Sequence, residues 1–232
     1  MPSKRLRLDR FLNKHAGVTR RSVRQVLAQG RVQVDGNIAS GISQVIGPFN
    51  RVMLDGALLQ DKHPLYVMMN KPKGVVSATK DNKHRTVIDL LDRPERFELH
   101  IAGRLDFNST GLILLSNDSR WSRNLSNPEN RITKWYRVET EKPIVEEAVS
   151  AFSKGMYFRY EDITTLPAQL RIIESHIAQI GLTEGRYHQI KRMFGQFDNK
   201  VVALHRQSIG HIQLDATLES GQSRALTVEE IG

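Results

Sequence analysis

The first apolar positions of the chain repeat at helical spacing. Four positions lie three or four residues apart and therefore share one face of a predicted helix: Leu8, Phe11, Leu12 and His15. Gly17 follows directly, as is typical where a helix ends. The pattern therefore predicts a short amphipathic helix close to the start of the chain.

A second predicted helix follows at once. Thr19 can cap its first turn, and Gly30 occupies the place where a left-handed residue commonly ends a helix. Its buried stripe is expected to consist of Val23, Val26 and Leu27.

Residues 31–38 alternate between apolar and polar side chains, which is the pattern of a strand with one buried face. The strand runs into Asp35-Gly36, a dipeptide favoured in two-residue hairpin turns, and Asp55-Gly56 repeats this signal. The stretch 59–64 has the composition of a hinge. We therefore place a domain boundary near residue 60, which divides the chain into residues 1–59 and 60–232.

Beyond this boundary, runs typical of strands outnumber helical ones. The predicted strands are 65–69, 74–78, 99–102, 112–115, 136–140, 168–173, 177–182 and 201–204. The predicted helices are 87–91, 119–125, 143–153 and 186–197. The two kinds do not alternate regularly, which argues against a doubly wound parallel sheet. We expect an α+β fold with a mainly antiparallel sheet.

The composition limits the chemistry that the chain can perform. Its 232 residues contain no cysteine, which excludes disulfides, thiolate metal sites and cysteine nucleophiles. The sequence has no Gly-rich phosphate loop and no close pair of histidine ligands, and His205 and His211 are interpreted as ordinary polar residues beside a strand. We therefore expect no cofactor and no metal. The lack of a signal peptide or a long apolar run predicts a soluble, cytoplasmic protein without membrane contact.

Positive charge is concentrated near the start of the chain. The net charge is +9; residues 1–50 carry nine Lys or Arg against two Asp, or +7, and the rest carries +2. Arg20, Arg21 and Arg24 lie near the start of the second predicted helix, where free backbone N–H groups also favour a phosphate. A solubilising tail is one interpretation of this charge. The helical periodicity favours a folded unit that binds a polyanion, with nucleic acid ahead of anionic lipid.

The order helix, helix and V-x-V-D-G hairpin, together with this charge, resembles the S4-type RNA-binding domain over residues 5–50. The resemblance implies that the first domain presents a basic face to structured RNA. Its expected contacts with the RNA backbone are Arg20, Arg21, Arg24 and Arg31.

The most informative stretch of the larger domain is HIAGRLDFNSTGLILL, residues 100–115. Two apolar strands flank a polar loop from Gly103 to Gly111, and Asp106 lies in this loop at a rigid strand end. Spacing alone favours an ordinary turn residue over a carboxylate that meets a ligand.

The sequence G-R-L-D, followed by S-T-G and an apolar strand, resembles the catalytic signature of the pseudouridine synthases. Three further motifs occur in that family's order: N-K-P-K-G at 70–74, K-W-Y at 134–136 and E-G-R-Y-H-Q-I-K-R-M-F at 184–194. Four ordered motifs are far more specific than one short pattern. With the S4-like start, the resemblance covers nearly the whole chain and implies an isomerase that needs no cofactor.

The resemblance implies roles for three residues. Asp106 would be the essential carboxylate, Tyr136 would stack on the uracil and remove a proton from its C5 atom, and Lys191 would be the cation beside Asp106. The family usually has an arginine in place of Lys191, so Arg192 is the alternative partner of Asp106. Without the family, Tyr136 would be interpreted as core packing and the two basic residues as a solvated helix face.

The remaining RNA contacts are implied in the same way. Arg104 would fill the space that an extruded uridine leaves in its stack. Other residues expected to bind RNA are Lys71, Lys73, Arg186 and Arg192.

An S4-like domain points to the branch of the family that modifies ribosomal RNA. The pair His188-Gln189 resembles the enzymes that modify 16S rRNA, at uridine 516, more than those of 23S rRNA. The expected partner is 16S rRNA or a small-subunit assembly intermediate, and the chain is expected to be a monomer. The residues themselves do not name the uridine. Two alternatives are a synthase of 23S rRNA and a non-catalytic S4-type RNA-binding or assembly factor, although a pure binder has no use for a carboxylate that repels phosphate.

Overall fold

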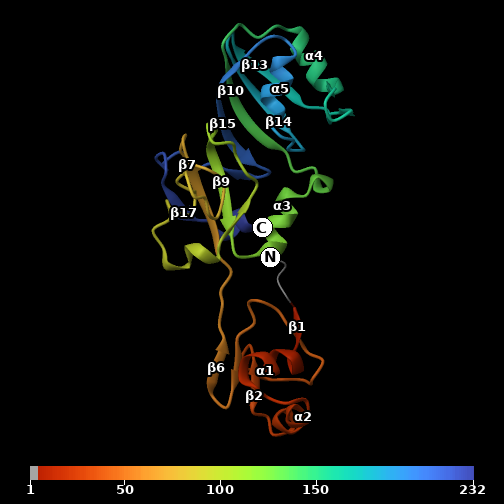
Figure 1. Cartoon of the computed structure of the whole chain (residues 1–232), viewed down its shortest axis with the longest axis vertical. Coiled ribbons are helices and arrows are strands. Elements are labelled where there is room, and N and C mark those ends of the chain that lie inside the picture. Colours follow the sequence, from red (N-terminus) through yellow and green to blue (C-terminus); the bar gives the residue numbers. More distant parts are fainter. Residues whose placement is uncertain (1–4) are drawn as a thin grey trace. The chain divides into compact units, whose positions relative to one another are not determined.

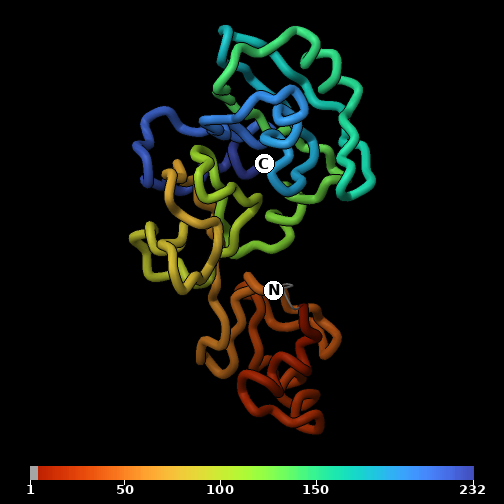
Figure 2. Tube along the Cα trace, turned by 45° about the horizontal axis from the view of Figure 1, so that its top comes forward, coloured from red at the N-terminus to blue at the C-terminus, as the bar shows by residue number. Residues whose placement is uncertain are grey.

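The computed structural model describes residues 5–232. The chain divides after Pro64 into two compact units, each formed by a continuous stretch of sequence (Figure 2). Within the described residues, no helix has the length and apolar character needed to span a bilayer.

The first unit contains the two predicted helices, α1 (Leu8–Ala16) and α2 (Arg20–Ala28). Gly17 and Gly30 follow them with φ of 66° each, and the Thr19 hydroxyl accepts a hydrogen bond from the Ser22 backbone at 3.3 Å. A four-stranded sheet has the order β3-β2-β5-β6, and a separate pair joins β1 to β4. The strands are β1 (Leu6–Arg7), β2 (Val32–Val34), β3 (Asn37–Ile38), β4 (Val45–Ile46), β5 (Val52–Leu54) and β6 (Ala57–Gln60).

Both Asp-Gly pairs form the expected hairpin turns. Asp35 and Gly36 have φ of 51° and 82°, and Asp55 and Gly56 have φ of 51° and 79°. Positive φ at both central residues matches the right-handed twist of the flanking strands. The second hairpin extends beyond the boundary placed near residue 60, because Gln60 still pairs with β5 and its side chain donates to two backbone carbonyls at 2.8 Å.

The second unit is built on one nine-stranded sheet (Figure 1). Its main order is β13-β14-β10-β15-β9-β7-β17, with β8 on β9 and β16 on β15. Every pairing is antiparallel except that of β9 with β15, so the predicted α+β fold with a mainly antiparallel sheet is confirmed. The strands are β7 (Tyr66–Lys71), β8 (His100–Ala102), β9 (Thr110–Ser116), β10 (Lys134–Thr140), β13 (Gln169–Glu174), β14 (Ile177–Leu182), β15 (Val201–Ile209), β16 (Ile212–Gln213) and β17 (Ser223–Ala225).

The helices of this unit are α3 (Ser119–Ser126), α4 (Glu147–Lys154), α5 (Gln189–Gly195) and α6 (Val228–Ile231), with 3₁₀ turns η1 (Pro94–Glu98) and η2 (Pro128–Asn130); β11 (Tyr157–Phe158) and β12 (Ile163–Thr164) form a small hairpin. Helix α3 matches its predicted range closely, whereas α4 and α5 are shorter than predicted. The C-terminal α6 lies beside α3, where the Trp121 indole donates to the Ile231 carbonyl at 3.1 Å (Figure 1).

Two predicted elements are wrong. Residues 87–91 form turns instead of a helix, and residues 74–78 form only one bridge, between Val76 and Thr86. The Asp89 carboxylate accepts from the backbone and the hydroxyl of Thr86, both at 2.8 Å. Such local side-chain bonds compete with a helix. The helix predicted from residue 143 likewise begins later, because the Ile144 backbone donates to Ser175 on the neighbouring loop.

Strand β9 is buried on both faces and anchors the sheet. Leu112 and Leu114 pack with Met68 in one apolar cluster, whereas Ile113 and Leu115 pack on the opposite side. A third cluster joins β10 and β14 to α4 and α5, and it reaches the loop before β9. The start of β9 is therefore a rigid position from which a loop residue can be presented.

The parallel contact between β9 and β15 requires a glycine. Gly111 has φ of 100°, and a Cβ there would overlap the Arg206 carbonyl oxygen and lie 2.7 Å from its backbone nitrogen. Both the backbone conformation and the close approach exclude a larger residue. The glycine of the S-T-G motif thus allows the two strands to meet.

We predict that Gly111→Ala destabilises the second unit. Forcing a methyl group against the β15 backbone, in a left-handed conformation, should lower the free energy of unfolding by about 2 to 4 kcal/mol. Urea unfolding of the purified variant measures this. The control is Gly195→Ala, because nothing lies within 4 Å of a Cβ at that position in α5. Equal stability of both variants would contradict the steric argument.

Candidate active site

Asp106 lies on the loop between β8 and β9, and hydrogen bonds to its backbone hold this loop in place. The Ser77 hydroxyl donates to the Leu105 carbonyl at 2.7 Å and accepts from the Leu105 backbone N–H at 3.0 Å. The Ser109 backbone donates to the Asp106 carbonyl at 3.1 Å. The Asp106 side chain keeps 34% of its surface exposed. A fixed backbone thus presents a carboxylate that a ligand can reach.

Two basic side chains face this carboxylate from the start of α5. The Lys191 Nζ atom lies 2.9 Å from Asp106 Oδ2, and His188 Nε2 lies 3.4 Å from the same oxygen. Lys191, and not its neighbour, is therefore the cation that pairs with Asp106. Arg192 turns away and binds Glu161 with both terminal nitrogens while its guanidinium covers the Phe158 ring.

Tyr136 approaches from β10, which β15 separates from β9 in the sheet. It lies on β10, opposite Arg206 of β15, and only 8% of it is exposed. Its hydroxyl is 3.5 Å from a terminal nitrogen of Arg206. The ring is buried as a core residue would be, yet it borders the same cavity as Asp106.

A cavity of about 480 Å³ brings these groups together. Asp106, Tyr136 and Lys191 line it, along with Arg104 and Arg186. Leu182 and Leu204 add an apolar surface. The cavity therefore combines an ion-paired carboxylate, an aromatic ring and apolar walls, an arrangement that suits a planar, uncharged base beside a reactive sugar.

Comparison with known proteins agrees with this geometry. The family model described as RNA pseudouridylate synthase matches residues 65–196, and the S4 domain model matches residues 6–52. The chain belongs to the RNA pseudouridylate synthase family. Its members are isomerases, so the expectation of an enzyme is confirmed.

Similar proteins extend the match over the full chain. A Pseudomonas aeruginosa protein named ribosomal small subunit pseudouridine synthase A is 50% identical over 227 residues, covering 97% of this chain and 99% of its own. The Escherichia coli K12 protein of the same name is 41% identical, covering 97% and 98%. A solved structure described as a pseudouridylate synthase has a TM-score of 0.71 and 38% identity, covering 97% of this chain and 98% of its own.

Arg206 supports the Asp106 loop of this pseudouridine synthase, and the sequence pattern did not reveal it. Its guanidinium, 1% exposed, donates to the carbonyls of Leu112 and Gly103 at 2.8 Å each and of Arg104 at 3.2 Å. It forms no ion pair with any carboxylate among residues 5–232. The predicted strand ended at Leu204, before the polar His205-Arg206 pair, so nothing in the pattern indicated a buried arginine.

Lys71 does not lie where an RNA contact would need it, which corrects the expectation from the N-K-P-K-G motif. The residue is fully buried, and its ammonium donates to the carbonyls of Ser109 at 2.8 Å and Pro72 at 3.0 Å. Burial lowers the pKa of Lys71 to about 8, while the charge of Asp106 opposes this shift. Lys71 supports the Asp106 loop from inside the synthase unit.

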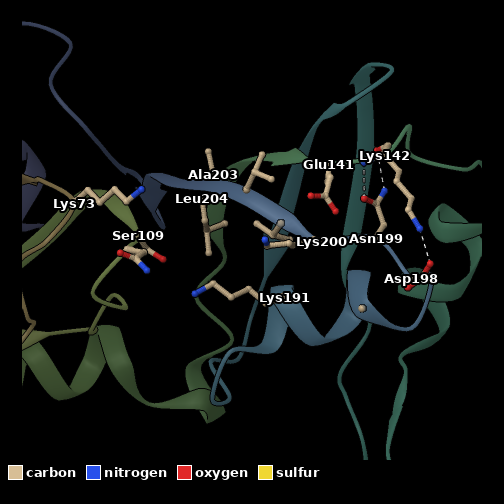
Figure 3. A pocket seen from close by; sticks show the side chains of 14 residues that line it. Lys73, Ser109, Glu141, Lys142, Lys191, Asp198, Asn199, Lys200, Ala203 and Leu204 are labelled. Carbon is tan, nitrogen blue, oxygen red and sulfur yellow. Dashed lines mark hydrogen bonds and ion pairs between the residues drawn. The ribbon is translucent and has the colours of Figure 1, made fainter.

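A second cavity of about 760 Å³ adjoins the first, and they share Ser109, Lys191 and Leu204 (Figure 3). Its basic side chains are Lys73, Lys142, Lys191 and Lys200, with Glu141 and Asp198 as the acidic ones. Lys142 binds Asp198 at 2.5 Å. The hydroxyl of buried Ser109 has no hydrogen-bond partner within the described part of the chain.

The basic residues of the first unit differ from one another. Arg20, Arg21 and Arg24 are exposed on α2 and form no ion pair with the residues that the structure describes. Arg31 instead binds Asp55 through two hydrogen bonds of 2.6 Å. Arg31 is therefore partly neutralised, whereas the three arginines of α2 keep their charge available to a ligand.

We predict that Arg206→Lys lowers stability although it keeps the positive charge. A lysine cannot reproduce the planar fork that holds three carbonyls, so unfolding should require about 2 to 4 kcal/mol less free energy. Urea unfolding is the measurement. Arg137→Lys, at an exposed position of β10 with a 3.7 Å ion pair, is the matched control and should change stability by less than about 0.5 kcal/mol. An unchanged Arg206→Lys variant would show that the fork is dispensable.

Proposed function

We propose that this pseudouridine synthase acts on the RNA of the small ribosomal subunit, with uridine 516 of 16S rRNA as the target. The observation that carries the proposal is the Asp106–Lys191 ion pair of 2.9 Å, which lies in one cavity with Tyr136. The S4 domain supports an RNA substrate. The names of the relatives from Pseudomonas aeruginosa and Escherichia coli support the small subunit.

The reaction explains why a carboxylate is the central group. Isomerisation of uridine breaks the C–N bond between uracil and ribose and joins the same ribose carbon to C5 of the same uracil. All atoms and electrons are retained: C5 loses a proton, and the uracil nitrogen that was released from the ribose gains one. Asp106 therefore has one of three tasks: to bond to the ribose carbon, to add to the uracil ring, or to act as a base.

Lys191 and Tyr136 assist Asp106 in this proposal. Lys191 stabilises the negative carboxylate when the substrate displaces water from the cavity. The buried Tyr136 ring stacks on the uracil, and its hydroxyl removes the C5 proton once the base has been re-attached.

The uridine must leave its stack in the folded RNA before Asp106 can reach it. Arg104 is exposed and borders the cavity two residues before Asp106. Its planar guanidinium can stack in the space that the base leaves. The exposed Arg186 lines the same cavity, but it binds Glu184 at 3.0 Å, so we assign it a supporting contact.

The RNA backbone is proposed to meet basic groups of both units. In the synthase unit, Lys73 and Lys200 line the second cavity and form no ion pair within residues 5–232. In the S4 unit, the three free arginines of α2 provide charge beside the helix start. The partner is 16S rRNA or an assembling small subunit, bound by a monomer in the cytoplasm.

We predict that Asp106→Asn abolishes pseudouridine formation and leaves RNA binding nearly intact. The amide has the same size as the carboxylate but can neither attack nor accept a proton. Mapping pseudouridine in 16S rRNA from cells that carry only the variant measures the reaction, and a titration with an rRNA fragment measures binding. Asp92→Asn, exposed and outside both cavities, is the control. Turnover within tenfold of the wild type would refute the role of Asp106. If the variant cells lost a pseudouridine from 23S rRNA and none from 16S rRNA, the choice of subunit would be refuted.

We predict that removal of residues 1–64 leaves a folded synthase unit that binds rRNA weakly. The apolar core of the first unit is separate from the clusters of the second, so the remainder should fold. The dependence of affinity on salt should flatten, because each lost phosphate contact changes the logarithmic slope by about 0.7 to 0.9. Titrations at several salt concentrations measure the slope. The full-length triple variant with Gln at Arg20, Arg21 and Arg24 should reproduce most of the change, and an unaltered slope would contradict the anchoring role.

A further inference from the structure

An exposed aromatic pair lies beside Asp106 and has no part in the proposed mechanism. Tyr187 and His188 are stacked, with ring centroids 3.9 Å apart and planes 22° apart. Both residues line the Asp106 cavity. His188 lies 3.4 Å from the carboxylate, whereas Tyr187 is 76% exposed. The pair thus extends from the reacting carboxylate to the open side of the cavity.

The loop that carries this pair is held rigidly. The buried Glu184 accepts hydrogen bonds from the Leu166 backbone and from the Gln189 side chain, both at 2.8 Å. Gln189 in turn accepts from the Arg186 backbone at 3.0 Å. His188 adopts φ of 49°, a conformation that costs free energy for a residue with a side chain. The surrounding contacts hold the two rings in a defined position, so little conformational freedom remains to be lost when a ligand binds.

Packing does not account for the Tyr187 ring. The residue belongs to none of the apolar clusters, and its hydroxyl has no hydrogen bond within residues 5–232. His188 is the ring that stacks against it. A rigid, exposed aromatic surface at the edge of a nucleotide site is suited to stacking with a base.

We propose that Tyr187 is a stacking platform for the nucleobase next to the target uridine. The inference rests on the proposed function. The target uracil occupies the interior of the cavity, against the buried Tyr136, which leaves the exposed Tyr187 for a neighbouring base. When a uridine is extruded, its neighbour loses a stacking partner, and the tyrosine ring replaces that partner. His188 joins this platform to the Asp106 carboxylate, so that binding of the neighbour aligns the reacting nucleotide.

The first test compares variants on the shortest 16S rRNA fragment that the wild type converts. Base stacking on an aromatic ring contributes enough for a roughly 5- to 150-fold effect, so Tyr187→Ala should raise KM by about tenfold or more. Tyr187→Phe keeps the ring and should behave as the wild type. Tyr160→Ala removes a tyrosine that is 96% exposed and lies outside both cavities, and it is the matched control. The salt dependence of KM should stay unchanged, because stacking involves no phosphate.

The second test uses fragments that lack the base of one neighbour, on either the 5′ or the 3′ side of the uridine. One of the two fragments lacks the base that stacks on Tyr187. On that fragment, the KM of the wild type should rise to the value that Tyr187→Ala shows on the intact fragment, and the KM of Tyr187→Ala should rise no further. The proposal would be overturned if Tyr187→Ala raised KM on both abasic fragments as much as on the intact one. It would also be overturned if Tyr187→Ala lowered kcat and left KM unchanged. Failure of the proposed function is seen separately, because the wild type would then form no pseudouridine in the intact fragment.

Discussion

The close approach of β9 and β15 at Gly111 and Arg206 is the contact on which the active site depends. Among the named strands of residues 5–232, these two form the only parallel pair, and they join the β7 side of the sheet to the β10 side. Arg206 continues the contact by binding carbonyls on both sides of the Asp106 loop. Asp106 belongs to one side of this junction and Tyr136 to the other. The packing between β9 and β15 therefore fixes the position of Asp106 relative to Tyr136.

Buried positive charge is concentrated around the same junction. Lys71, Lys134 and Arg206 are buried, and none of them has a carboxylate ion pair within the described residues. Backbone carbonyls satisfy their donors instead. Burial lowers the pKa of Lys134, and the neighbouring Arg206 lowers it further. Such a set of cations is costly to fold, but it favours negative groups, both a carboxylate and an approaching phosphate, at the rim of the cavity.

In the proposed function, one unit attracts the RNA and the other carries out the reaction. In that proposal, the exposed arginines of the first unit attract RNA over a long range; the apolar core of this unit is separate from the clusters of the second unit. The second unit is nearly neutral in sequence and uses its charges locally, around one cavity and the lysine-lined cavity beside it. Because each unit has its own core, changes in one should leave the folding of the other intact.

Local patterns in the sequence determined most elements and indicated the groups that the proposed mechanism uses. The Asp-Gly turns, the two capped helices and the apolar β9 depend on neighbouring residues only, so spacing alone predicts them. The motifs around Asp106, Tyr136 and Lys191 carried the chemistry by family resemblance.

Only the tertiary structure decided which charges meet. Lys191 and Arg192 are adjacent in sequence, yet one faces Asp106 and the other Glu161, because α5 is fixed against the sheet by Ile190 and Phe194. The burial of Lys71 and Arg206 likewise results from contacts between residues 38 and 94 positions apart. Such long-range contacts leave no periodic pattern, so they become visible only when the chain is folded.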